Sequence, residues 1–234
     1  MALPHIARIA ALSCCALACG GSVSLAAAQP TAERPRTEPV IPRGARNAGS
    51  STGSLVGGVE LRERAELRLR WPDGPRWARP GLVRLLVRAA ESVDRRYPGS
   101  VLLVGDLSSR EGGSLRGHRS HRSGRDADVA FYYSDARGNR VQSARLLPVR
   151  ASGAAASGLR FDEARNWALV EVLVSDSAAN VKSIFVAAAL KRRLLAYAGR
   201  AGIDADLLAR ADAAMRQPAR GRPHDDHFHV RIAE

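Results

Sequence analysis

Apolar residues recur at every third or fourth position in four stretches of the chain, and this spacing predicts four amphipathic helices. The clearest stretch covers residues 81 to 97 and stops at a Pro-Gly pair. Asp162 has the short acceptor side chain of a helix N-cap and precedes the second stretch, which continues to about residue 175. Residues 187 to 198 and 205 to 215 complete the helical set.

Four shorter runs have the pattern of β-strands. Residues 101 to 104 and 184 to 186 are compact apolar runs that suit buried strands, and residues 128 to 133 predict a strand that begins at an acidic residue. Residues 227 to 232 alternate strictly, so one face of that strand is apolar and the other carries two histidines and an arginine. We therefore expect an α+β domain with a small antiparallel sheet, flanked by helices and long loops.

The N-terminal residues 1 to 28 have the composition of an export signal. One positive residue, Arg8, precedes an apolar stretch that ends in three alanines. A transmembrane anchor is the alternative, but small residues dilute the stretch, and no later segment is long and apolar enough to span a bilayer. Residues 29 to 58 are rich in proline, arginine, glycine and serine and predict a disordered linker before a domain at 59 to 234.

All three cysteines lie in the expected leader, at positions 14, 15 and 19, so the mature chain would carry no thiol. This excludes disulfides and a cysteine nucleophile from the mature protein. Residues 16 to 19 also resemble a lipobox, so lipid anchoring at Cys19 is the alternative to free release. We expect the mature protein in the periplasm.

The formal net charge is +13, and arginine supplies most of it because Lys182 and Lys191 are the only lysines. For an exported protein, this charge favours cell-wall carboxylates and polymers or anionic lipid as partners rather than nucleic acid. A general arginine bias, spread along the chain without a binding role, explains the same charge. The composition alone leaves both explanations open.

The candidate chemistry lies in two histidine clusters. Five of the six histidines fall in them, and the clusters are His118 with His121, and His224, His227 and His229. In the first cluster His121 precedes Asp128 by seven residues with Gly124 between them. Imidazole and carboxylate suit Zn²⁺, and the glycine lets the backbone bring both towards one point. A third nitrogen from the second cluster would leave one tetrahedral position for water, as in catalytic zinc sites.

These residues resemble the penicillin-insensitive murein endopeptidases, within the lysostaphin, D-Ala-D-Ala peptidase and hedgehog superfamily. The resemblance is carried by Ser-His-x-x-Gly-x-Asp-x-Asp at 120 to 128 and His-x-His at 227 to 229, and it covers roughly residues 70 to 232. It implies that the sheet carries a zinc site with His121, Asp128 and His229 as ligands. It further implies hydrolysis of D-alanyl–meso-diaminopimelyl cross-links in peptidoglycan through a zinc-activated water.

The same resemblance implies that His227 is the general base and that His224 assists transition-state stabilisation. His118 is a candidate for a second metal or a substrate contact, and Ser120 for a substrate contact. Some relatives bind a second zinc with the histidine equivalent to His118 and an Asp and a His between the two motifs. This chain has no histidine between His121 and His224, so one zinc per chain is expected.

Several questions stay open at the level of the sequence. Asp126, Asp225 and Asp226 are candidates for contacts that fix imidazole tautomers, and nothing in the sequence selects among them. The arginines at 119, 122 and 125 suit either substrate carboxylates or a solvated basic loop. The same metal site also serves a D,D- or L,D-carboxypeptidase, or a non-catalytic wall-binding module that keeps the zinc.

Overall fold

The computed structural model describes residues 53 to 233, so the expected signal peptide, the cysteines and most of the expected linker lie outside the described residues. Residues 53 to 58, which we expected to belong to the linker, are part of the fold. Leu55 is buried, and its backbone N–H donates to the carbonyl of Glu111 at 2.8 Å. The fold therefore includes residues before the expected boundary at 59. Among residues 53 to 233, no helix has the length and apolar character that crossing a bilayer requires.

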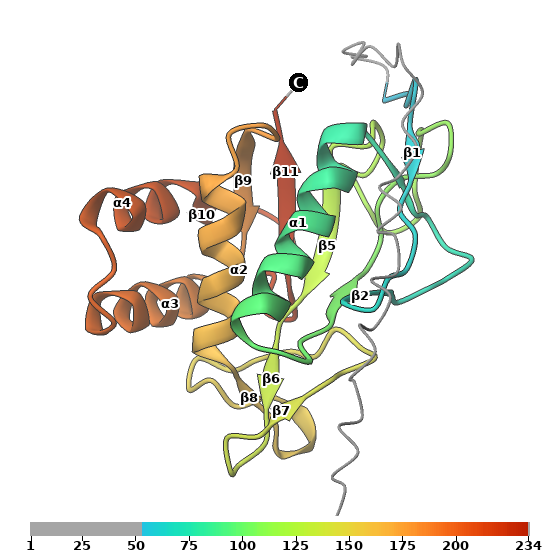
Figure 1. The fold of residues 1–234 in the computed structure, drawn as a ribbon. Helices are drawn as coiled ribbons and strands as arrows, with labels where there is room; N and C mark the ends of the chain where they lie inside the picture. Colours follow the sequence, from blue (N-terminus) through green and yellow to red (C-terminus); the bar gives the residue numbers. More distant parts are fainter. Residues whose placement is uncertain (1–52, 234) are drawn as a thin grey trace, which may run out of the picture. The chain divides into compact units, whose positions relative to one another are not determined.

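A six-stranded sheet lies at the centre of the fold, in the order β10-β9-β11-β5-β4-β2 (Figure 1). Its strands in chain order are β2 (Leu67–Leu69), β4 (Leu102–Val104), β5 (Asp126–Ala130), β9 (Val181–Phe185), β10 (Met215–Arg216) and β11 (His227–Ile232). The four central strands pair antiparallel, whereas β2 and β10 pair parallel with their neighbours at the two edges. The predicted α+β class is confirmed, with a sheet that is antiparallel only in its centre.

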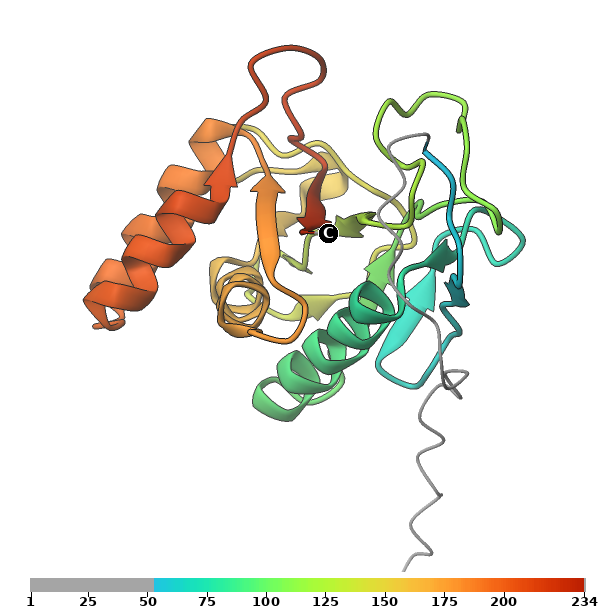
Figure 2. The same ribbon diagram turned by 90° about the horizontal axis from the view of Figure 1, so that it is seen from above.

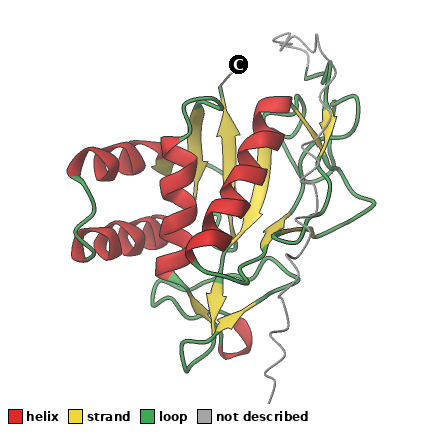
Figure 3. Ribbon diagram, in the orientation of Figure 1, coloured by secondary structure: helices red, strands yellow, loops and turns green. Residues whose placement is uncertain are grey.

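Two smaller sheets accompany the main one (Figure 3). One pairs β1 (Val59–Glu60) with β3 (Trp77–Ala78), and the other joins β7 (Arg140–Val141), β6 (Tyr133–Ser134) and β8 (Arg160–Phe161), with a 3-10 turn at Ala156–Gly158 before β8. The sequence pattern did not predict these strands, because two residues show no periodicity.

All four predicted helices are present, and they are α1 (Pro80–Arg96), α2 (Glu163–Ser175), α3 (Ala188–Arg200) and α4 (Ala205–Ala214). The N-cap at Asp162 is confirmed, because its carboxylate accepts from the backbone N–H of Arg165 at 3.0 Å. α1 and α2 lie side by side on one face of the sheet (Figure 1), and α3 and α4 contact α2 and the edge strand β10. Figure 2 shows the β4–β5 and β10–β11 loops on the opposite side of the sheet from α1.

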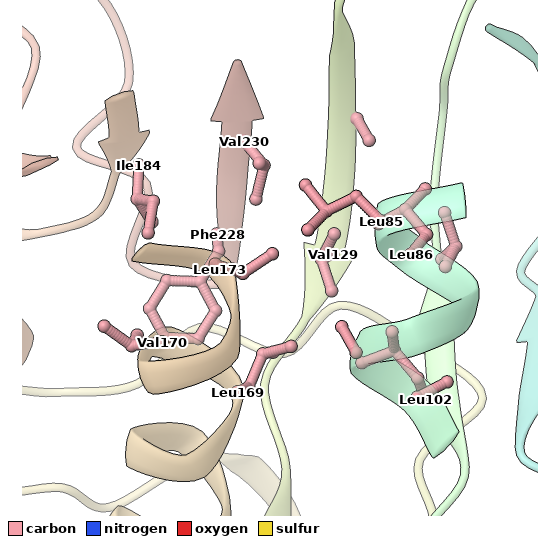
Figure 4. Close-up of a cluster of buried hydrophobic side chains, with 14 of the residues drawn as sticks. Leu85, Leu86, Leu102, Val129, Leu169, Val170, Leu173, Ile184, Phe228 and Val230 are labelled. Atoms are coloured by element: carbon pink, nitrogen blue, oxygen red, sulfur yellow. The ribbon is translucent and has the colours of Figure 1, made fainter. Parts of the chain in front are cut away.

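The hydrophobic core fills the space between the sheet and the helices α1 and α2 (Figure 4). Leucines of both helices, Leu85, Leu86, Leu169 and Leu173 among them, face apolar side chains of the central strands, such as Val129, Phe228 and Val230. Side chains alternate between the two faces of a strand. The polar residues of β5 and β11 therefore lie together on the face away from these helices.

The strand predicted at 128 to 133 begins and ends earlier than expected. It starts at Asp126, because that residue pairs with Arg231 of β11, and it stops at Ala130. The Asn166 side chain of α2 then takes the place of a neighbouring strand at Tyr132. Its Oδ1 accepts from the Tyr132 backbone N–H at 3.0 Å, and its Nδ2 donates to the Tyr132 carbonyl at 2.8 Å.

We expect Asn166→Ala to lower the free energy of unfolding by about 1–3 kcal/mol, because it leaves the buried backbone N–H of Tyr132 without a partner, while the Tyr132 carbonyl keeps its bond from the Asp162 N–H. Chemical denaturation followed by circular dichroism measures the loss. Gln142→Ala, which truncates an exposed amide, is the control and should change stability by no more than about 0.5 kcal/mol. Equal effects of the two substitutions would show that the Asn166 contacts do not stabilise the fold.

Candidate metal centre

The polar face of β5 and β11 brings together residues that are about a hundred positions apart in the sequence. The register pairs His229 with Asp128 and Arg231 with Asp126. Directly paired residues of antiparallel strands lie on the same face. The β4–β5 loop adds His118 and His121 to this face, and the β10–β11 loop adds His224.

Ligand atoms of His121, Asp128 and His229 form a closed triangle. His121 Nε2 lies 3.3 Å from Asp128 Oδ1 and 3.3 Å from His229 Nδ1, and the latter two atoms are 3.0 Å apart. Bond lengths of about 2.0–2.1 Å around a tetrahedral ion separate its ligands by about 3.3–3.4 Å. The triangle therefore has the size that a small divalent ion requires, and all three side chains are buried.

Two separate sets of three side chains satisfy a looser criterion. Ligand atoms lie within 4.8 Å of one another in the set His224, His227 and His229, and likewise in the set His118, His121 and Asp128. The triangle above joins members of both sets through Asp128 at shorter distances. The cluster is thus one continuous group of imidazoles around one carboxylate that could hold a metal ion.

Hydrogen bonds decide which ring nitrogen of each histidine is free to bind a metal. The Nδ1–H of His121 donates to the carbonyl of Leu107 at 2.8 Å, and this leaves the lone pair on Nε2. The Nε2–H of His229 donates to the carboxylate of Asp126 at 2.9 Å, and this leaves the lone pair on Nδ1. In both rings the remaining nitrogen belongs to the triangle and faces Asp128, so it can bind either a proton shared with that carboxylate or a metal ion.

Asp128 carries negative charge in this site although it is almost inaccessible to solvent. Burial raises the pKa of its carboxyl, but hydrogen bonds with His121, His227 and His229 outweigh burial and hold the pKa well below its usual value. An anionic carboxylate in a buried position requires positive partners, and imidazolium or a cation supplies them.

His227 lies beside the triangle. Its Nδ1–H donates to Asp226 at 2.5 Å, and its Nε2 lies 3.3 Å from Asp128 Oδ1. Burial lowers the pKa of His227, but the hydrogen bonds with Asp128 and Asp226 outweigh it and raise the pKa to about 9.

His224 has a left-handed backbone with φ of 54°, and its ring centroid lies 5.0 Å from that of His227. Its Nδ1–H donates to the carbonyl of Arg222 at 3.0 Å, so the loop backbone fixes the ring. Burial, followed by the charges of His227 and His229, lowers the pKa of His224 to about 4.

His118 and Ser120 lie at the edge of the cluster. The Nε2–H of His118 donates to Asp106 at 2.9 Å, and this bond, opposed by burial, raises the pKa of His118. Its Nδ1 lies 3.7 Å from Asp128 Oδ2. Ser120 Oγ lies 3.3 Å from His229 Nε2. The sequence reasoning missed Asp106 as a site residue, although an acid two residues after a buried strand was a usable signal.

Of the three aspartates proposed to fix tautomers, Asp126 contacts His229 and Asp226 contacts His227, as described above. Asp225 uses its backbone carbonyl to accept from Val149 at 2.7 Å. Arg119 and Arg122 are exposed, whereas Arg125 donates to Ser123 within its own loop at 3.0 Å.

The fold and this cluster define an α+β protein with a buried histidine and aspartate site of the size and donor type that hold a metal ion. The chain belongs to the penicillin-insensitive murein endopeptidase family, whose sequence pattern matches residues 48–233. The resemblance inferred from the two motifs is therefore confirmed.

Proteins named penicillin-insensitive murein endopeptidase are similar to this chain. The one from Yersinia enterocolitica is 30% identical over 168 residues, which are 70% of this chain and 60% of the relative. The one from Pectobacterium atrosepticum is 33% identical over 162 residues, 65% of this chain and 51% of the relative. The one from Escherichia coli O157:H7 is 30% identical over 220 residues, 90% and 73% respectively. The first two matches span less than two thirds of the relative's length.

Gly124 allows the loop to reach the site, because its φ is +68° and a Cβ there would lie 2.9 Å from the backbone nitrogen of Arg79. We expect Gly124→Ala to lower the free energy of unfolding by more than about 1 kcal/mol, from backbone strain and overlap together. Gly99→Ala is the matched control, because Gly99 also has a positive φ but no atom within 4 Å of its Cβ position. Equal losses in thermal denaturation would refute a role for the close contact at Gly124.

Proposed function

We propose that this protein is a zinc-dependent endopeptidase that hydrolyses the D-alanyl–meso-diaminopimelyl cross-links of peptidoglycan. Family membership and the names of the relatives support a murein endopeptidase. The observation that carries the metal-dependent part is the closed triangle of His121, Asp128 and His229, with each free ring nitrogen directed into it.

His121 Nε2, His229 Nδ1 and an oxygen of Asp128 would hold the zinc ion. Two nitrogens and one oxygen are a ligand set that Zn²⁺ accepts, and three protein ligands are the number typical of catalytic zinc sites. When bound, zinc lowers the pKa of water to about 7 and polarises a carbonyl as a Lewis acid. We assign one zinc per chain, because the chain has no histidine between His121 and His224 that could complete a second site.

His227 is our candidate for the general base. Asp226 holds the Nδ1 proton of its ring, so protons exchange at Nε2, the atom that faces Asp128. His224 lies beside it, and we assign it to transition-state stabilisation. Because its Nδ1–H is donated to the carbonyl of Arg222, its Nε2 is the ring nitrogen that remains for chemistry, and the two histidines need separate tests.

The setting of this activity is also part of the proposal. We propose that residues 1 to 28 direct export and are removed, and that the enzyme acts in the periplasm on peptidoglycan without nucleic acid as a partner. Lipid attachment at Cys19 is the alternative to release. Ser120, at the edge of the cluster beside His229, and the exposed Arg119 are candidates for contacts with the substrate.

We expect the purified protein to bind one equivalent of zinc and to lose it with His121→Ala or Asp128→Ala, because two ligands cannot hold the ion tightly. Competition with a chromophoric chelator and elemental analysis measure affinity and stoichiometry. His118→Ala is the matched control, since it removes a neighbouring imidazole outside the triangle, and it should keep the full equivalent. Loss of zinc in that control would contradict the assignment of the ion to the triangle, and two equivalents in the wild-type chain would contradict the one-zinc assignment.

The zinc-loaded protein should release monomeric muropeptides from cross-linked sacculi and stop doing so in a chelator, as mass spectrometry of the digest would show. His227→Ala should keep its zinc and lower kcat by about 100-fold or more, because general-base catalysis contributes about 10²–10⁴-fold. Intact cross-linked muropeptides after incubation would refute the substrate assignment. Release of a single free amino acid would instead indicate a carboxypeptidase.

A further inference from the structure

A fully buried carboxylate connects the metal centre to an arginine on the same strand pair. Asp126 of β5 is 0% exposed and lies opposite Arg231 of β11. Arg231 binds it with two hydrogen bonds, Nε to Oδ1 at 2.8 Å and Nη2 to Oδ2 at 3.0 Å. Oδ1 also accepts from His229 Nε2 at 2.9 Å. The three side chains therefore form a chain of contacts from the protein surface to a proposed ligand.

Three hydrogen bonds hold the buried carboxylate of Asp126, two from Arg231 and one from His229. Two parallel N–H donors from one guanidinium fix the plane of a carboxylate. Asp126 is thus held in one orientation, and its Oδ1 also accepts from the imidazole of His229.

The orientation of the His229 ring depends on a side chain, that of Asp126, whereas the orientation of the His121 ring depends on a backbone carbonyl. His121 donates to a backbone carbonyl, that of Leu107, which no side-chain substitution at that position removes. The Nε2 of His229 instead faces two side-chain oxygens, the Asp126 carboxylate at 2.9 Å and the Ser120 hydroxyl at 3.3 Å. Only the carboxylate is charged and buried, so it is the partner that fixes the ring and makes Nδ1 more basic.

We propose that Asp126 and Arg231 are positioning residues that hold His229 with its Nε2–H directed at Asp126 and its Nδ1 available to bind the metal ion. Asp126 orients the ring, and Arg231 orients Asp126. The inference builds on the metal site of the proposed function but not on its substrate. The competing explanation is that Asp126 and Arg231 are an ion pair that only joins β5 to β11.

The two explanations differ in their effect on metal binding. We expect Asp126→Ala and Asp126→Asn to lower zinc affinity by about 10- to 100-fold, and Arg231→Lys to lower it less, since lysine keeps the charge but loses the bidentate geometry. In the cobalt-loaded protein the absorption bands of the ion should shift for the Asp126 variants, because the ring of one ligand is no longer fixed. Chelator competition and visible spectroscopy at a temperature where each variant is folded give both readouts.

Asp162→Asn provides the matched control, because Asp162 forms an ion pair of 2.8 Å with the buried Arg165 away from the metal centre. It should lower stability and leave zinc affinity and the cobalt spectrum unchanged. Wild-type zinc affinity and an unchanged cobalt spectrum in Asp126→Asn would overturn the proposal and leave only the strand-joining role. If Asp126→Ala does not fold, Asp126→Asn and Arg231→Lys still distinguish the positioning role from the strand-joining role. Zinc binding without cleavage by the wild-type chain would contradict the proposed peptidase and not this assignment.

Discussion

The burial of one anionic carboxylate, that of Asp128, determines the arrangement of the polar face. A charge removed from water is tolerated only when opposite charges and hydrogen bonds replace its hydration. The structure supplies nitrogens from three directions, from His121 in a loop and from His227 and His229 on β11, each at 3.0–3.3 Å from the same oxygen. A site that gathers imidazoles around a buried anion is also a site in which a divalent cation is stabilised.

The position of that carboxylate depends on the pairing of β5 with β11. Because side chains alternate along a strand, the register that puts Phe228 and Val230 into the core also puts His229 opposite Asp128. A slip of one residue would expose the apolar side chains and bury the polar ones. The hydrophobic core against α1 and α2 therefore fixes the geometry of the candidate metal centre, although the two lie on opposite faces of the sheet.

Features that repeat along the sequence could be predicted from it, and features that depend on a distant partner could not. The alternation of residues 227 to 232 shows which side chains share a face, and the structure has that strand with the same bounds. The start of β5 at Asp126 depends on Arg231, about a hundred residues away, so no local pattern marks it. The end of β5 depends on the side chain of Asn166, which is equally remote.

The candidate ligands could be predicted, since histidines and aspartates are visible as residue types and their spacing matched a known pattern. The tautomers of the histidines could not be predicted, because two of the acceptors that fix them are backbone carbonyls, those of Leu107 and Arg222. Any residue type can supply such a carbonyl. The sequence therefore indicates which side chains are candidate ligands, and only the fold indicates which atom of each side chain faces the site.

The charge of the site is opposite to the charge of the chain. The formal net charge is +13, yet four carboxylates, those of Asp106, Asp126, Asp128 and Asp226, bond to imidazoles in this one cluster. Arg231 neutralises one of them, and the other three act on the histidines alone. A small cation is therefore favoured at short range, where the carboxylates dominate, although the chain as a whole is positively charged.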